Sequence, residues 1–193
     1  SQAVALLQAE DQKANLIKHY DIALARQVAF DLTHQGEDSL LHEQWHRLEA
    51  PGGPYQSLAV HSHVMHQGDL NTIQEIMQRY ANWSICAFSQ DHTIAIHASA
   101  LDSSRLHQAC VDLAAVHDDA RVGVGSTVLE PWQFKDSFHT ALRSLEKSFF
   151  HPGQKVFSPC QTAAIDLSGA GLRAFVDLMF DDRQLAEEKL HSA

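Results

Sequence analysis

The stretch RVGVGSTVLEPWQFKDSFHTALRSLEKSFFHPGQKVF, residues 121–157, decides the fold. It starts with a short apolar strand pattern that contains two glycines in G-x-G spacing, which permits close approach of a neighbouring backbone. A helix is predicted next, opened either by Pro131 in its first turn or by Asp136 a few residues later. A Pro-Gly turn and a last strand, Lys155–Phe157, complete a strand, helix, strand pattern that is typical of a mixed α and β domain.

Three more strands and two helices are predicted upstream of this stretch. Alternating apolar and polar residues predict the first strand over Tyr55–Met65. Two later strands, separated by four polar residues, predict a hairpin. The helices begin at Asp69 and at Asp102 or Ser103, because these side chains can accept the first N–H groups of a helix. From Tyr55 the order predicts an α+β, ferredoxin-like and mostly antiparallel sheet, with one helix and one strand added.

Helical segments are predicted on both sides of the sheet. No Gly or Pro occurs from Gln2 to about His34, and the composition favours one long helix there. Its apolar spacing is interrupted by Asp11 and Asp21, so two interpretations stay open. The helix forms a coiled coil that dimerises and passes on a signal, or it packs as an amphipathic helix on its own domain.

A break at Pro51–Pro54 follows a short predicted helix, Leu40 to about Glu49. A helical pattern over Leu172–Leu190 then closes the chain. We therefore expect three parts: an N-terminal helical linker over residues 1–50, a sheet domain over 51–160 and a C-terminal helical linker over 161–193. Because the chain starts without Met and stops just after a helical pattern, we expect it to be a piece of a longer polypeptide.

Composition excludes several classes of function. The formal net charge is −10 over 193 residues, so most of the surface repels a nucleic-acid backbone. No apolar run approaches the roughly 20 residues that span a bilayer, and no secretory signal is visible, so we expect a cytoplasmic protein without membrane contact. Three widely spaced cysteines, Cys86, Cys110 and Cys160, fit neither a disulfide framework nor a zinc ribbon, and are expected to be reduced thiols.

Three short motifs carry a resemblance to a known family. They are Val122–Ser126 (VGVGS), Asp136–Leu142 (DSFHTAL) and Lys155–Phe157 (KVF). Together with the order of elements, they resemble the degenerate GGDEF-like domain of bacterial transcription regulators, a fold of the nucleotide-cyclase kind. The resemblance covers roughly residues 15–190, and its individual motifs are less specific than a metal or nucleotide signature.

The resemblance also implies a parent protein and a function. The chain looks like the middle part of an AraC-type, YesN-like response regulator of a two-component system; PucR/CdaR-like regulators are the near alternative. It then acts as a non-catalytic regulatory and dimerisation module that relays a signal from a receiver domain to a helix-turn-helix domain. The implied partners are a second copy of the chain and an unknown small-molecule effector. DNA is bound only through a domain outside the chain.

The positions that make true GGDEF domains active differ in this chain. Those enzymes form cyclic di-GMP from GTP with a glycine-rich acidic hairpin and a carboxylate at the end of the first strand. Here the hairpin reads Ser89-Gln90-Asp91-His92, where bulky residues block close approach to a nucleotide. The strand end reads His61-Ser62-His63, and imidazoles replace the oxygen ligands that Mg²⁺ prefers. We therefore expect no enzyme activity, no catalytic residue and no cofactor, with residual nucleotide chemistry as the weakest alternative.

Histidines suggest a second hypothesis, a sensor of a metal or small molecule. His61 and His63 share one face of the first predicted strand, and His97 lies on the third strand, which neighbours the first in a ferredoxin-like sheet. Three imidazoles on one patch could hold Zn²⁺ or gain protons together in mild acid; otherwise they are ordinary polar positions. The adjacent pair Asp118-Asp119 is interpreted as a helix boundary, because a general acid and base have to converge in space.

Overall fold

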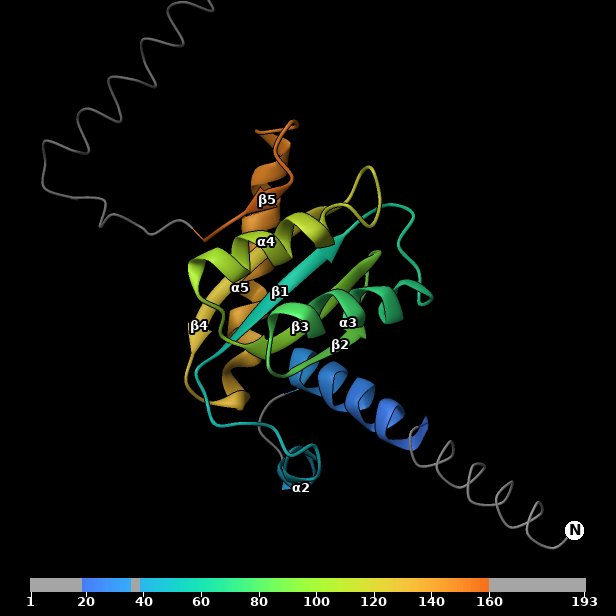
Figure 1. Ribbon diagram of the computed structural model, residues 1–193, viewed down its shortest axis with the longest axis vertical. Coiled ribbons are helices and arrows are strands. Elements are labelled where there is room, and N and C mark those ends of the chain that lie inside the picture. The colour runs from blue at the N-terminus through green and yellow to red at the C-terminus, as the bar shows by residue number, and fades with distance from the viewer. Residues whose placement is uncertain (1–18, 36–38, 160–193) are drawn as a thin grey trace, which may run out of the picture. The chain divides into compact units, whose positions relative to one another are not determined.

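Five strands form one sheet in the order β2-β3-β1-β4-β5. Strand β1 pairs antiparallel with β3 and β4, β2 pairs antiparallel with β3, and β5 joins β4 in parallel. The predicted α+β, ferredoxin-like sheet with one added strand is therefore confirmed (Figure 1). The strand bounds are β1 Tyr55–His61, β2 Ser84–Phe88, β3 Thr93–Ser99, β4 Arg121–Val128 and β5 Val156–Phe157.

The computed structural model describes residues 19–35 and 39–159. The predicted tail Leu172–Leu190 and the first part of the predicted long helix lie outside these residues. The helices are one over residues 19–34, α2 Ser39–Arg47, α3 Asp69–Tyr80, α4 Ser103–Leu113 and α5 Phe134–Glu146, with short 3-10 turns at Pro131–Gln133 and Lys147–Phe149. Among the described residues, no helix is both long and apolar enough to cross a membrane.

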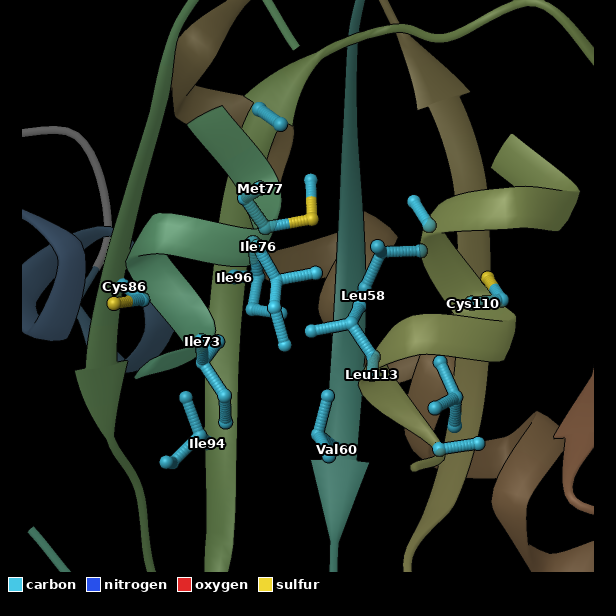
Figure 2. Packing of buried hydrophobic residues seen from close by; sticks show 14 of the residues in the cluster. Leu58, Val60, Ile73, Ile76, Met77, Cys86, Ile94, Ile96, Cys110 and Leu113 are labelled. Carbon is cyan, nitrogen blue, oxygen red and sulfur yellow. The ribbon is translucent and has the colours of Figure 1, made fainter. Parts of the chain in front are cut away.

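One face of the sheet is covered by α3 and α4, and the core between them is apolar. Leu58, Val60, Ile94 and Ile96 point from the sheet towards these helices, as Figure 2 shows. Cys86 and Cys110 are buried in the same core as free thiols, and burial raises the pKa of each to about 12. Burial of this apolar area is the main stabilising contribution from this face.

Helix α5 covers the opposite face and lies directly on β4. A Cβ atom added at Gly123 would overlap the carbonyl oxygen of Ala141, and one at Gly125 would overlap that of Ser137. The two glycines of the G-x-G pattern are therefore needed for close packing of helix on strand, as predicted from the sequence. The helix starts at Phe134, after a 3-10 turn that opens at Pro131, so the earlier of the two predicted openings is confirmed and the start at Asp136 is wrong.

The helix over residues 19–34 packs on the same face as α5, next to β2 and β3. Its buried side chains Val28, Ala29 and Leu32 belong to an apolar cluster completed by Leu41, Trp45, Tyr55, Ile85, Ala87 and Phe134. The end of the predicted long helix that the structure describes therefore packs on its own domain, which was the second of the two interpretations. Leu41 and Trp45 of α2, four residues apart on one face of this helix, are both buried.

Strand β1 is shorter than the sequence predicted, because it ends at His61 instead of Met65. The next two residues leave the ladder, since the Asp119 carboxylate binds the Ser62 hydroxyl and the His63 N–H. Met65 is nevertheless buried, through a turn in which its N–H donates to the Ser62 carbonyl at 3.0 Å. Strict alternation over eleven residues thus predicted four strand residues that in fact form a loop.

Candidate functional site

The hairpin turn Ser89–His92 is held by internal hydrogen bonds. The Ser89 N–H donates to the Thr93 carbonyl at 2.7 Å, and a His92 ring nitrogen lies 3.2 Å from the Met65 carbonyl. Asp91 and His92 adopt left-handed backbone conformations, with φ of 55° and 56°. Asp and His tolerate this conformation better than most residues, so the turn closes without a glycine. Side chains therefore occupy the position where glycines would leave room for a ligand to approach the backbone.

The end of β1 is tied to the start of β4 through Asp119. Its carboxylate accepts the Ser62 hydroxyl at 2.5 Å and the His63 N–H at 2.8 Å, and the Ser62 bond is the largest cause that lowers the pKa of Asp119. The sequence interpretation of Asp119 as a helix boundary missed this role. The antiparallel prediction contained the signal, since a residue just before β4 has to come close to the end of β1.

The three histidines of the predicted patch do not come together. His97 pairs with Ser57 in the β1–β3 ladder, whereas His61 pairs with Thr93 at the other end of the strands. His97 is fully buried, and desolvation lowers its pKa to about 3. The expectation of one patch was wrong because strand neighbours share a patch only where their registers coincide, and these two positions are four residues apart along β3.

His61 and His63 do approach each other, with ring centroids 5.4 Å apart. Burial, and next the neighbouring His63, lower the pKa of His61. Within residues 19–35 and 39–159, no group of three or more His, Cys, Asp or Glu side chains is arranged to hold a metal ion. The pair therefore lacks the third ligand that a structural or catalytic zinc site uses.

His97 instead joins the sheet to the helix over residues 19–34. Its Nδ1 lies 2.9 Å from the Ser57 hydroxyl, and its Nε2 lies 2.8 Å from the Thr33 hydroxyl and 3.2 Å from the Ala29 carbonyl. Because a carbonyl only accepts, we assign the ring proton to Nε2, and Ser57 then donates to Nδ1. This buried network was not predicted, because periodicity does not show which polar residue meets another segment.

The hairpin turn and the strand end both open into one cleft of about 940 Å³, the hairpin cleft. Its polar lining comes from the last turn of the helix over residues 19–34, the hairpin and the adjoining ends of β1 and β4, and includes Thr33, His34, His61, His63, Ser89, Gln90, Asp91, Asp119 and Arg121. Its apolar lining comes from α5 and the turn after it: Phe138, Leu142, Leu145 and Phe149. The same elements also contribute the polar residues His139, Glu146 and Ser148. Of the positions singled out in the sequence, Ser89, Gln90 and Asp91 of the hairpin and His61 and His63 of the strand end thus line one cavity, whereas His92 does not.

Comparison with known proteins is consistent with this geometry. Residues 33–146, more than half of the chain, match the protein family described as GGDEF-like domain, and the chain belongs to that family. No curated protein matches the chain. The expected resemblance to a GGDEF-like domain is therefore confirmed at the level of the family.

Two solved structures are similar to the chain. The first is a regulator of polyketide synthase expression from Bifidobacterium adolescentis, with a TM-score of 0.51 and 8% identity over 66% of this chain and 51% of that one. The chain thus spans about half the length of that protein, and at this identity the likeness concerns the fold alone. The second is the coiled coil and GGDEF domain of DgcB from Caulobacter crescentus in complex with c-di-GMP, with a TM-score of 0.38 and 15% identity over 82% of this chain and 100% of that one.

Proposed function

We propose that this chain is a non-catalytic regulatory module of a bacterial transcription regulator. In this role it dimerises and relays a signal from an input domain to a DNA-binding domain outside the chain. The observation that carries the proposal is the internal bonding of both positions where a GGDEF enzyme would hold its metal and nucleotide. The Asp119 carboxylate accepts hydrogen bonds from Ser62 and His63, and a ring nitrogen of His92 in the hairpin turn lies 3.2 Å from the Met65 carbonyl.

Absence of cyclase activity is the first test of this proposal. Asp119 lies beside the end of β1, and both of its oxygens already accept hydrogen bonds from the chain. A divalent ion bound there would have to compete with these bonds. Purified protein incubated with GTP and Mg²⁺ is expected to give no cyclic di-GMP by mass spectrometry, with an active GGDEF enzyme as the positive control. Formation of the dinucleotide would contradict the proposal.

The regulator role draws support from the solved structure named as a regulator of polyketide synthase expression. We propose an AraC-type, YesN-like response regulator as the parent protein and a PucR/CdaR-like regulator as its alternative. The parent is then a cytoplasmic, DNA-binding protein whose input is a receiver domain. Sequencing the gene on both sides tests this: a receiver before residue 1 and a helix-turn-helix after residue 193 support the first parent, and their absence contradicts it.

The relay is proposed to run through the helix over residues 19–34. Val28, Ala29 and Leu32 are buried in the domain, so a movement of this helix has to disturb the core or carry the domain with it. The apolar spacing continues upstream at Leu7, Ala14 and Ile17. We propose that these upstream positions meet a second copy of the chain in a coiled coil.

Light scattering on the chain without residues 1–18 tests the dimer. This deletion keeps every buried residue of the described helix, so the domain is expected to stay folded, whereas removal of residues 1–34 would open the core. We expect the complete chain to be a dimer and the shortened chain to be a monomer. A monomer in both cases, or a dimer in both cases, would contradict dimerisation through the upstream helix.

A second candidate function is sensing of a small molecule. The hairpin cleft favours it, because about 940 Å³ lies within the range of ligand pockets in proteins. The three-histidine metal site is not favoured, since His97 lies buried at the far end of the strands from His61.

A further inference from the structure

We propose that the hairpin cleft binds a small organic carboxylate with an apolar body, and that Arg121 receives the carboxylate group. The proposal goes beyond the regulatory function, because binding itself does not require that function. It is carried by the two-sided lining of the cleft, the bonding of Arg121 and the balance of charges around it.

The apolar side of the cleft is contributed by α5 and the turn after it. Phe138, Leu142 and Leu145 recur at helical spacing, and Phe149 extends this surface beyond the end of the helix. The Phe149 side chain is 88% exposed, although it is large and apolar. Such exposure leaves apolar area that a ligand with an aromatic or aliphatic body can cover.

The polar side contains one guanidinium group that is fixed in place and forms no ion pair with a carboxylate of the described residues. Arg121 Nη1 donates to the carbonyls of Asp119 and Ala120 at 3.0 and 3.3 Å, and Nη2 donates to the Pro152 carbonyl at 3.2 Å. These bonds use three of its five N–H groups. Within the part of the chain that the structure describes, no carboxylate forms an ion pair with Arg121, so two donors and a full charge remain for an anion.

The position of Arg121 brings two imidazoles near the same anion. Arg121 is the register partner of His61 across β1 and β4, so both side chains start from the same face of the sheet. The His63 ring lies 5.4 Å from the His61 ring, centroid to centroid. Neutral imidazoles can donate a hydrogen bond to a carboxylate oxygen, which adds geometric selection to the charge of Arg121.

The surrounding charges favour a ligand with one negative charge over a polyphosphate. Asp91, Asp119 and Glu146 also line the cleft, and the whole chain carries a formal net charge of −10. These three carboxylates repel any anion, and the repulsion grows with the charge of the ligand, so a nucleoside triphosphate is disfavoured far more than a monocarboxylate, whose one charge the guanidinium can pair. The cleft therefore suits a monocarboxylate and not the substrate of a nucleotide cyclase.

The occupied cleft would also contact the helix over residues 19–34. Thr33 and His34 line the cleft, and His34 Nε2 lies 3.3 Å from the Ser89 hydroxyl on the hairpin turn. Lys135 of α5 donates to the His34 carbonyl at 3.3 Å. A ligand that bridges α5 and the hairpin thus stabilises the last turn of this helix. This step, unlike binding, rests on the proposed relay function.

Titration of the protein with 2-naphthoate tests the site, with binding monitored by NMR chemical-shift changes or by isothermal titration calorimetry. Ordinary ligand efficiency for a molecule of this size gives a Kd of about 1 mM. Acetate lacks the apolar body and 2-naphthylmethanol lacks the charge, so each is expected to bind at least about tenfold more weakly. GTP with Mg²⁺ is titrated in the same way as the nucleotide ligand, and it is expected to bind more weakly than 2-naphthoate.

Two matched pairs of variants locate the site. Phe149→Ala is expected to weaken 2-naphthoate several-fold, whereas Phe150→Ala, a neighbour that is 82% exposed and outside the cleft, is expected to leave the Kd unchanged. Arg121→Gln is expected to weaken binding about tenfold or more, and Arg105→Gln on α4 is the control. Because Phe149 is exposed, its variant tests the proposal even if Arg121→Gln does not fold.

The proposal is overturned if no binding is detected at a 2-naphthoate concentration of about ten times the expected Kd. It is also overturned if the Phe149→Ala variant binds 2-naphthoate as tightly as the Phe150→Ala variant does, or if the protein binds GTP more tightly than 2-naphthoate. Hydrogen exchange of residues 25–34 separates the two levels of the proposal. Slower exchange with 2-naphthoate supports coupling to the helix. Binding with unchanged exchange supports the site and contradicts only the relay.

Discussion

The two faces of the sheet are built on different principles, and consecutive residues of β3 show the contrast. Ile96 points to the face covered by α3 and α4, where the packed side chains are apolar. His97 points to the opposite face, where it bonds to Ser57 of β1 and to Thr33 of the N-terminal helix. Both side chains are fully buried. Both faces bury apolar area, but only the second adds a specific hydrogen-bonded attachment between segments through His97; we call the first the apolar face and the second the polar face.

This difference assigns different tasks to the two faces. An apolar core tolerates many packings of similar volume, whereas a hydrogen-bond network accepts one arrangement. The polar face also holds the helix over residues 19–34 and adjoins the hairpin cleft. The elements proposed to carry a signal therefore lie on the face whose contacts are specific, and the other face serves as their support.

Ile96→Ala is expected to produce the largest loss of stability, because it opens a cavity in the apolar face. Truncation of a fully buried Ile typically costs about 2 to 5 kcal/mol, and we expect about 3 to 4 kcal/mol here. Urea unfolding monitored by circular dichroism measures the change in the free energy of unfolding. A loss below about 1 kcal/mol would show that this face is loosely packed, contrary to the comparison.

Ser57→Ala is expected to cost about 2 kcal/mol, because it leaves the buried Nδ1 of His97 without a donor. Adding His97→Leu is expected to restore about half of this loss, since Thr33 can still donate to the Ala29 carbonyl at 2.7 Å. A double-mutant cycle gives the coupling energy of the two side chains. Simple additivity of the two substitutions would contradict the network.

The polar face is also expected to make stability depend on pH. Burial lowers the pKa of the His97 imidazole from 6.5 to about 3, so the unfolded chain binds more protons than the folded chain between these values. The contribution of the neutral His97 ring to the free energy of unfolding is fully present above the pKa that this group has in the unfolded chain. This contribution is lost as the pH falls below that value. The slope from this one group is at most about 1.4 kcal/mol per pH unit.

Unfolding by urea at about pH 7 and about pH 5 measures this slope. The Ser57→Ala/His97→Leu variant lacks the imidazole and serves as the control, because every other titratable group is retained. A slope in this variant equal to that of the unaltered chain would contradict the assignment to His97.

Thr33→Val is expected to have the smallest effect, below about 0.5 kcal/mol. It removes a hydroxyl and keeps the side-chain shape, while His97 Nε2 retains the Ala29 carbonyl at 3.2 Å. The helix side of the network is thus redundant, whereas Ser57 has no substitute. Differential scanning calorimetry of Thr33→Val beside Ser57→Ala makes this comparison directly, and equal losses would contradict it.

The elements on both faces were predictable from the sequence, and the hydrogen bonds that connect distant segments on the polar face were not. Alternation in β1 and β3 and the helical spacing in α3 gave the bounds of these elements to within a few residues, because each depends on local periodicity. His97 was placed on the correct strand and still grouped with the wrong partners, since register depends on contacts between distant segments. Asp119 was missed for the same reason, as its partners Ser62 and His63 lie far away in the sequence.

The close contact of α5 with β4 has a mechanical consequence. At Gly123 and Gly125 the helix meets the strand main chain to main chain, so no side chain can yield between them. We expect α5 and the sheet to move as one rigid body, in which the distance between the helix and the strand stays constant. The helix over residues 19–34 meets the sheet through side chains, so a tilt of this helix has to repack Val28, Ala29 and Leu32 and rearrange the His97 hydrogen bonds.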